Sequence, residues 1–228
     1  MNRMEVCQHI QEIGVIPAIW VTSADDACFA AGTLESGRIP ILEITLAGPE
    51  AIELLAHVVH HHPKVMVGAG TVLDCETAKR AADAGASFLT APGFDFSIAE
   101  FAARENLAVI PGALTPTEVV TAWRVGADFI KVFPCAQVGG DKYIQALKKA
   151  LPQIPLIAAG GVTQHTATDF ILAGAAALGV GTELIPPDAI ARRQAARIRE
   201  LAHRFLGFVK DARTRLEQGN AKRTVPKK

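Results

Sequence analysis

Short hydrophobic segments alternate with longer amphipathic stretches along most of the chain. Eight segments are rich in β-branched and other apolar residues, and they cover residues 15–21, 40–46, 64–70, 87–93, 108–114, 129–134, 156–161 and 177–182. The first residues of successive segments lie 21 to 27 positions apart. Nearly continuous apolar runs of this length are typical of strands that are buried on both faces of a parallel sheet.

The stretches between these segments have the apolar spacing of helices. Residues 115–118 read Thr-Pro-Thr-Glu, which is a capping box with proline at the first helical position, so a helix is predicted to begin there. Gly85, Gly126 and Gly174 lie where three of the helices should end. The chain therefore alternates between strands and helices.

Eight strand–helix units at this spacing predict an α/β fold, a (β/α)8 TIM barrel formed as a single domain by residues 1–186. An open doubly wound sheet is the alternative, but no G-x-G-x-x-G motif follows the first strand. Apolar residues continue at helical spacing after Pro187, which predicts a C-terminal helical segment over residues 187–218 that packs on the barrel or on a neighbouring subunit. Residues 219–228 are expected to form a disordered basic tail.

The composition excludes several classes of protein. Half of the 228 residues are hydrophobic, yet no apolar run approaches the roughly 20 residues of a membrane helix. The first residues do not have the pattern of a signal peptide. The four cysteines (Cys7, Cys28, Cys75 and Cys135) lie far apart in the sequence and form no C-x-x-C motif, so we expect them to be reduced thiols. We therefore expect a cytoplasmic protein without a membrane partner.

The net charge is zero, but the charge is distributed unevenly. From Arg192 onward there are twelve lysines and arginines and only three acidic residues. This basic segment could contact a polyanion, but a solvated basic helix face is the simpler interpretation, because no nucleic-acid-binding motif precedes it. We expect no nucleic-acid partner.

Two charged residues interrupt the predicted strands. Lys131 lies between apolar residues in residues 129–134, and Glu43 is the only acidic residue in any of the eight segments. A charge that points outward beneath a helix would be trapped without water, whereas both can point inward near the C-terminal ends of the strands. Active sites of TIM barrels lie at that end. A buried ion pair without chemistry is the alternative.

The environment of such a lysine suggests its chemistry. Burial disfavours the ammonium form and makes a neutral amine available as a nucleophile. The amine can attack a ketone to form a protonated Schiff base, which makes a carbon–carbon bond two atoms away breakable. A nearby carboxylate, here Glu43, can carry the protons that this reaction moves.

Several motifs in residues 41–186 together resemble one enzyme family, the 2-keto-3-deoxy-6-phosphogluconate / 4-hydroxy-2-oxoglutarate aldolases. In chain order they read ILEITL, VGAGTVLD, TAPGF, PGALTPTE, IKVFP, AAGGV and GVGTELIP. The resemblance implies a class I aldolase, a lyase that releases pyruvate from a 2-oxo acid aldol. It also implies a homotrimer that uses no cofactor and no metal.

The resemblance also assigns roles to individual residues. Lys131 matches the Schiff-base lysine and Glu43 the acid/base glutamate. Thr71 matches a threonine that contacts the pyruvate portion, and Phe133 an aromatic residue beside the lysine. The pair at residues 92–93, Pro92 and Gly93, matches a turn at the mouth of the barrel.

Glycines near the ends of the last two predicted strands suggest a phosphate site. These residues are Gly160, Gly161, Gly179 and Gly181, and the Thr182 hydroxyl follows them. Exposed backbone N–H groups at this place in a TIM barrel often bind phosphate. The alternative is that the glycines only permit tight turns.

The chain departs from the family at one recognition element. Members usually carry an arginine at the end of the first strand or shortly after the second, where this chain has Trp20 and Ala47. Loss of an arginine removes a strong bidentate anion contact, so we expect the substrate preference to differ.

Other features suggest weaker hypotheses. His57 and His61 have the spacing of two metal ligands on a helix, but the histidine cluster at residues 57–62 closes that helix, where histidines suit the negative end of the dipole, so no metal is expected. Two other functions remain open from the residues alone. One is a sugar-phosphate isomerase or epimerase with Glu43 as base, and the other is a non-catalytic ligand-binding barrel.

Overall fold

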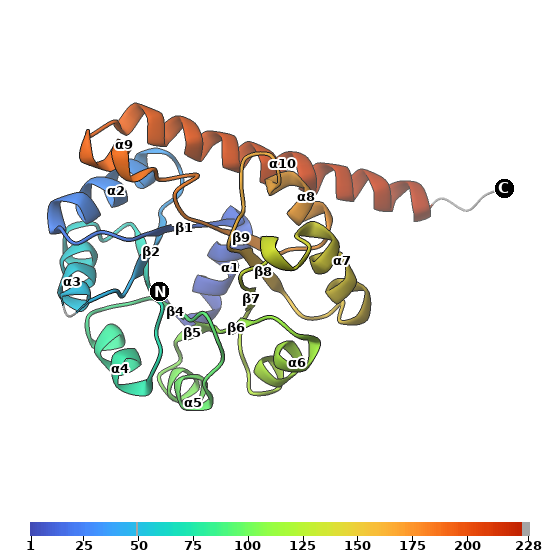
Figure 1. The fold of residues 1–228 in the computed structure, drawn as a ribbon, viewed down its shortest axis with the longest axis horizontal. Coiled ribbons are helices and arrows are strands. Elements are labelled where there is room, and N and C mark those ends of the chain that lie inside the picture. Colours follow the sequence, from blue (N-terminus) through green and yellow to red (C-terminus); the bar gives the residue numbers. More distant parts are fainter. Residues whose placement is uncertain (49, 225–228) are drawn as a thin grey trace.

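The computed structural model describes residues 1–48 and 50–224, which form a barrel of parallel strands surrounded by helices (Figure 1). The strands are β1 (Val15–Ile19), β2 (Ile41–Thr45), β3 (Met66–Gly70), β4 (Phe88–Thr90), β5 (Ala108–Ile110), β6 (Gly112–Ala113), β7 (Ile130–Val132), β8 (Leu156–Ala159) and β9 (Ala177–Val180). All neighbouring pairs are parallel. The predicted α/β barrel is confirmed.

The helices follow the strands in the predicted alternation. They are α1 (Arg3–Ile13), α2 (Ala24–Ser36), α3 (Ala51–His61), α4 (Cys75–Asp83), α5 (Phe96–Arg104), α6 (Pro116–Arg124), the 3-10 helix η1 (Ala136–Val138), α7 (Asp141–Ala150), α8 (Ala167–Leu172), α9 (Pro187–Ala191) and α10 (Ala195–Thr224). The capping box at Thr115 begins α6. Gly85, Gly126 and Gly174 follow α4, α6 and α8 with positive φ angles, as predicted.

One predicted strand is split in two. The segment 108–114 forms β5 and β6, which are separated by Pro111. Proline has no N–H to donate, so it interrupts the regular pairing there. Because β5 pairs with β4 and β6 pairs with β7, this split strand joins the two ends of the sheet and closes the barrel.

Helix α1 was not predicted from the sequence. It contacts β1, β5 and β9 and buries Val6 and Ile10. Arg3, in its first turn, forms an ion pair with Asp128, which precedes β7. Helix α1 thus covers the end of the barrel at which the strands begin, opposite the expected active site.

The C-terminal region differs from the expected segment 187–218. The backbone breaks at Arg193, which has a φ of 52°, so α9 and α10 are separate helices. Helix α10 continues to Thr224, six residues into the segment 219–228 that was expected to be disordered. No proline lies between Ala195, where the helix begins, and Pro226, so no residue in this stretch breaks the helix by its ring. Residues 225–228 lie outside the described residues.

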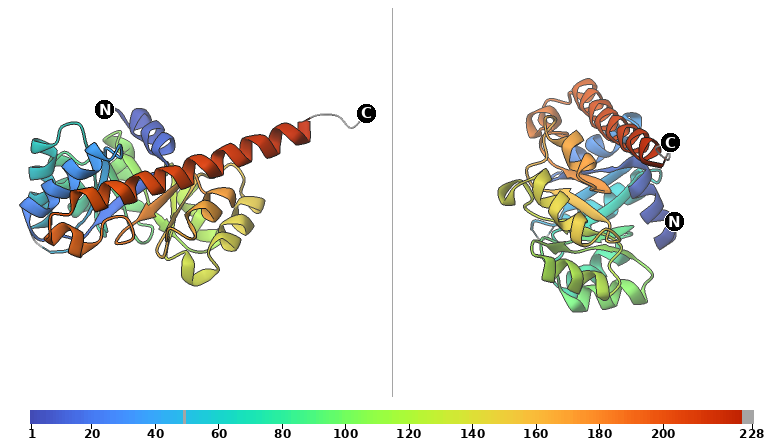
Figure 2. Two further views of the ribbon diagram at one scale, coloured as in Figure 1. Left: turned by 90° about the horizontal axis from the view of Figure 1, so that it is seen from above. Right: turned by 90° about the vertical axis from the view of Figure 1, so that its right-hand side faces the viewer.

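Helix α10 lies along the barrel and extends past it (Figure 2). It packs against α8 and α2, and its apolar side is buried at Ile198, Ala202, Phe205, Val209 and Ala212. Among the described residues, no helix is both long enough and apolar enough to cross a membrane.

Arg213 of α10 ties this helix to α1. Its guanidinium donates hydrogen bonds to the carbonyl oxygens of Gln11 and Glu12 at the end of α1, at 2.5 and 2.8 Å. A third bond, of 3.2 Å, reaches the carbonyl of Ala176, just before β9. One side chain therefore satisfies carbonyl groups that the helix cannot pair internally.

We predict that Arg213→Ala lowers the free energy of unfolding by about 1–3 kcal/mol, because three hydrogen bonds from a charged donor are lost, one of them to the partly buried carbonyl of Ala176. Urea denaturation monitored by circular dichroism measures this change. Arg215→Ala is the matched control, since Arg215 is exposed on the same helix. Equal denaturation midpoints for the two variants would contradict the proposed tie.

Candidate active site

The lysine and the glutamate singled out in the strands face each other inside the barrel. Lys131 lies in β7 and Glu43 in β2, and the distance from Nζ of Lys131 to Oε1 of Glu43 is 3.4 Å. Their side chains are only 14% and 7% exposed. Each charge thus compensates a partner that would be costly to bury alone.

Thr90 completes this polar cluster. It is the last residue of β4 and is 2% exposed, and the Lys131 ammonium lies 3.3 Å from its hydroxyl oxygen. The sequence analysis missed Thr90. The signal available was a hydroxyl residue at the C-terminal end of an otherwise apolar strand, the same position that Thr45 occupies in β2.

Small residues flank this cluster in the strand register. Glu43 lies beside Ala18 and Gly68, and Lys131 lies beside Gly112. Residues that are paired in a parallel barrel point to the same side, so these small residues also face the interior. The ring of Phe88 takes up the space at Gly68 and the Pro92 carbonyl that at Gly112, so the two glycines let other groups pack closely around the pair.

Gly70 is required by the position of Glu43. A Cβ atom at Gly70 would lie 2.3 Å from Oε1 of Glu43 and 2.8 Å from its Cδ, far closer than van der Waals contact. The absence of a side chain at the end of β3 thus lets the carboxylate reach toward Lys131.

Two residues singled out by the resemblance lie at strand ends at this end of the barrel. The ring centroid of Phe133 is 5.6 Å from Nζ of Lys131, and 37% of Phe133 is exposed. Thr71 directly follows β3 and has a φ of 60°, a left-handed conformation that is uncommon for threonine and recurs at functional sites.

The turn at Pro92 and Gly93 lies against the split strand. The N–H of Gly112 donates a 3.0 Å hydrogen bond to the carbonyl of Gly93. A Cβ atom at Gly112 would lie 2.1 Å from the carbonyl oxygen of Pro92. Because Gly112 is the register partner of Lys131, this turn lies next to the lysine strand.

Packing accounts for two of the glycines in the predicted phosphate site. A Cβ atom at Gly160 would lie 2.8 Å from Cα of Pro134, and one at Gly161 would lie 2.4 Å from Cβ of Ala136. Both have positive φ angles. The loop after β8 therefore needs glycine in order to pack against the loop after β7, whether or not a ligand binds there.

The loop after β9 is less crowded. A Cβ atom at Gly181 would meet only the carbonyl oxygen of Ala18, at 3.9 Å, and Thr182 begins the turn that follows. Gly179, inside β9, lies against the side chain of Ala159. Gly161 and Thr182 are exposed and Gly160 and Gly181 are half-buried, so a ligand can approach backbone groups of both loops.

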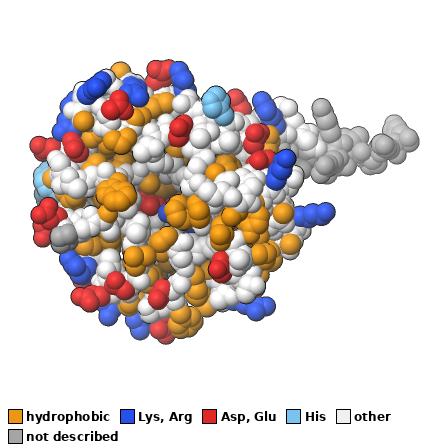
Figure 3. Space-filling model, viewed as in Figure 1, with side chains coloured by type: hydrophobic (Ala, Val, Ile, Leu, Met, Phe, Trp, Pro, Cys, Tyr) orange, Lys and Arg blue, Asp and Glu red, His pale blue; other side chains and the backbone are white. Residues whose placement is uncertain are grey.

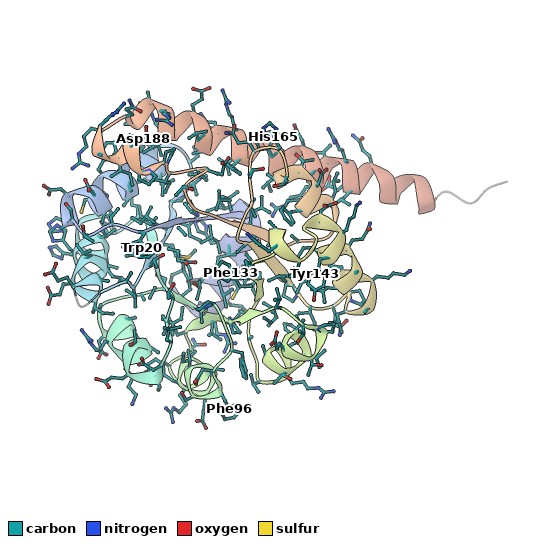
Figure 4. The ribbon with its side chains drawn as sticks, viewed as in Figure 1. Trp20, Phe96, Phe133, Tyr143, His165 and Asp188 are labelled. Carbon is teal, nitrogen blue, oxygen red and sulfur yellow. The ribbon has the colours of Figure 1, made fainter. Side chains whose placement is uncertain are left out.

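Trp20 stands at the mouth where an arginine was expected from the resemblance. Its side chain is 73% exposed. It lines a cavity of about 180 Å³ between the loop after β1 and helix α9, together with Val21, Thr22, Asp26, Pro187 and Ile190. Figure 4 shows Trp20 and Phe133 inside the ring of helices, and Figure 3 shows hydrophobic side chains gathered around the centre of the same face.

The remaining candidates take no part in this cluster. The rings of His57 and His61 stack at the end of α3, 4.0 Å apart. Within residues 1–48 and 50–224, no group of three or more potential ligands is placed to hold a metal ion. Burial raises the pKa of the Cys135 thiol to about 11, which makes it a poor nucleophile.

A (β/α)8 barrel with a buried amine beside a carboxylate at the C-terminal ends of its strands has the arrangement of a class I aldolase. The aldolase family described as KDPG and KHG aldolase matches residues 6–201. The chain belongs to this family and is therefore a lyase.

Individual relatives agree with this assignment. The 2-dehydro-3-deoxy-6-phosphogalactonate aldolase of Escherichia coli K12 is 33% identical over 162 residues, which is 70% of this chain and 78% of that protein. The KDPG aldolase of Legionella pneumophila, solved with pyruvate captured as a covalent carbinolamine, is 28% identical with a TM-score of 0.80, covering 86% of this chain and 96% of that one.

A designed protein cage built from fused symmetric oligomeric domains is also similar. It is 28% identical with a TM-score of 0.84, covering 93% of this chain and 78% of that chain. The family match ends at residue 201, within α10, so Arg213 lies beyond the matched region.

We predict that Gly70→Ala reduces the rate of aldol cleavage by about 10²-fold or more, because the new methyl group displaces the Glu43 carboxylate. Its loss should approach that of Glu43→Gln in the same steady-state assay. Gly207→Ala is the control, since nothing lies within 4 Å of a Cβ atom at that glycine. Full activity of a folded Gly70→Ala protein would disprove this role of Gly70.

Proposed function

We propose that this aldolase cleaves a 2-oxo-3-deoxy acid into pyruvate and an aldehyde through a Schiff base on Lys131. One observation carries the proposal, namely the buried Lys131 amine 3.4 Å from the Glu43 carboxylate at the open end of the barrel. The pyruvate adduct in the Legionella relative supports the same chemistry. Membership of an aldolase family argues against an isomerase and against a barrel without activity.

The reaction begins with capture of the substrate. Within the ion pair, the Lys131 ammonium first passes a proton to the Glu43 carboxylate. The neutral amine then attacks the 2-oxo carbon to give a carbinolamine, and Glu43 returns that proton to the hydroxyl group that leaves as water. The product is a protonated Schiff base. Its positive charge withdraws electrons from C3 and prepares the C3–C4 bond for cleavage.

Cleavage needs a base at the C4 hydroxyl. The Glu43 carboxylate takes this proton, the C3–C4 bond breaks, and the aldehyde leaves. The electron pair of the broken bond forms an enamine on the pyruvate portion. Protonation of the enamine at C3 and hydrolysis of the Schiff base then release pyruvate and restore the amine.

The surrounding residues are proposed to hold the substrate. Thr71 contacts the pyruvate portion, while Phe133 and the turn at Pro92 and Gly93 bound the site beside Lys131. Thr90 positions the lysine amine through the hydroxyl that lies 3.3 Å from it. No metal and no organic cofactor enters this mechanism.

Backbone groups after the last two strands are proposed to contact the distal portion of the substrate. The residues concerned are Gly160, Gly161, Gly181 and Thr182. Gly161 and Thr182 are exposed, so each of the two loops offers an accessible contact. The family name covers a phosphorylated sugar acid and 4-hydroxy-2-oxoglutarate as substrates.

We predict that borohydride reduction in the presence of pyruvate adds a stable mass to the peptide that contains Lys131. Mass spectrometry of the digested protein locates the adduct. Lys131→Met should abolish it, whereas Lys142→Met, on the neighbouring α7, should leave it intact. An adduct elsewhere, or none in folded protein, refutes the proposal.

We also propose that the protein is a cytoplasmic homotrimer. Its four cysteines are free thiols, as expected in a reducing compartment. The similar designed cage is built from symmetric oligomeric domains, which supports an oligomer. We predict a sedimentation equilibrium mass of three chains of 24.1 kDa. A mass equal to one chain at assay concentration would exclude the trimer.

A further inference from the structure

We propose that this aldolase prefers an aldol whose distal portion is uncharged over a phosphorylated one, and that Trp20 determines the preference. The inference rests on the proposed function and adds to it the class of substrate. It follows from three observations: the charge of the loops around the mouth, the ion pairs that Lys131 and Arg193 already form, and the apolar surface of Trp20.

The loops at the mouth of the barrel lack the cations that most often bind phosphate. The loops that lead from the strands to the next helices contain no lysine and no arginine; they comprise residues 20–23, 46–50, 71–74, 91–95, 114–115, 133–140, 160–166 and 181–186. A phosphate carries nearly two negative charges, and proteins bind it chiefly with arginine and lysine side chains.

The same loops contain four carboxylates, which are Glu50, Asp74, Asp95 and Glu183. Hydrogen bonds from the backbone N–H of Thr77 and from the hydroxyl of Ser97 lower the pKa of Asp74 and of Asp95 respectively, so both stay ionised. The loops around the opening are thus negatively charged. A substrate with a second anionic group would be repelled there.

The cations close to the site are already engaged. Lys131 is required for the 2-oxo carbon and pairs with Glu43. Arg193, after α9, forms an ion pair with Asp26 and stands over the ring of Phe29 at 5.0 Å. Because Asp26 itself lines the cavity beside Trp20, that cavity carries a neutralised pair and no free cation among the residues that line it.

His165 is the only histidine in these loops. It is exposed, and Figure 4 shows it at the rim beside α10, away from Trp20 and Phe133. The helices that follow β8 and β9 have only six and five residues, so a phosphate at the glycine loops would be bound by backbone N–H groups without a cation from these loops.

Trp20 presents an apolar surface in the place where that anion contact would be needed. Trp20 directly follows β1, and Figure 4 shows it inside the ring of helices on the same face as Phe133. The indole is 73% exposed, although a ring of this size is usually buried. Its face can pack on the C–H groups of a hydroxylated carbon chain, and its N–H can donate to a hydroxyl.

The test compares two compounds that differ only in phosphate, 2-oxo-3-deoxygluconate and its 6-phosphate. Pyruvate release by the full-length protein is measured for both. We expect kcat/KM to be at least about tenfold higher for the unphosphorylated compound. Trp20→Ala should raise KM for that compound about tenfold with little change in kcat, while Trp20→Phe should retain most of the affinity.

Trp20→Arg provides the opposite change. It should raise kcat/KM for the 6-phosphate and lower it for the unphosphorylated compound, because a cation is restored at the mouth. Higher kcat/KM of the unmodified protein for the 6-phosphate overturns the inference, as does an unchanged KM in Trp20→Ala.

Borohydride trapping of pyruvate in each variant separates the two proposals. A protein that traps pyruvate but prefers the 6-phosphate, or that cleaves neither compound, refutes only the inference about the substrate. A protein that does not trap pyruvate on Lys131 refutes the proposed function as well.

Discussion

The architecture of the site depends on one ion pair, between the Lys131 amine and the Glu43 carboxylate, held inside a barrel that excludes most of the water. Neither charge is tolerable there alone, so the two strands that carry them must be placed on opposite sides of one narrow interior. The pair also needs room for its side chains, and Gly70 at the end of β3 leaves it beside the Glu43 carboxylate. Charge compensation and small side chains together create a compartment in which an amine can meet a ketone.

Most of the fold was predictable because the strands of this barrel are buried on both faces. Their apolar runs are continuous and evenly spaced, so their number and order were visible in the sequence. The split at Pro111, helix α1 and the end of α10 were not predicted. Helix α1 has a capping box at Asn2 and Glu5 and ends at Gly14, but it precedes the first strand of the repeat and buries only Val6 and Ile10, so its apolar pattern is weak.

The site was partly predictable for a related reason. A charged residue inside an apolar strand is rare enough to stand out, and this identified Lys131 and Glu43. Thr90 and Gly70 were missed because threonine and glycine are ordinary residues at the ends of strands. Their importance comes from a hydroxyl 3.3 Å from Nζ of Lys131 and from the space that Glu43 occupies. Such relations exist only after folding.

The tie between Arg213 and α1 has a consequence for synthesis of the protein on the ribosome. Its longest-range hydrogen bond joins Arg213 to Gln11, which are 202 positions apart in the sequence. Nascent chains emerge from their N-terminus, so every strand of the barrel has left the ribosome before this arginine does. The barrel can therefore pair its strands during translation, but α1 is fastened beneath them only as the last step. Until then α1 is held there only by the burial of Val6 and Ile10 and by the ion pair between Arg3 and Asp128.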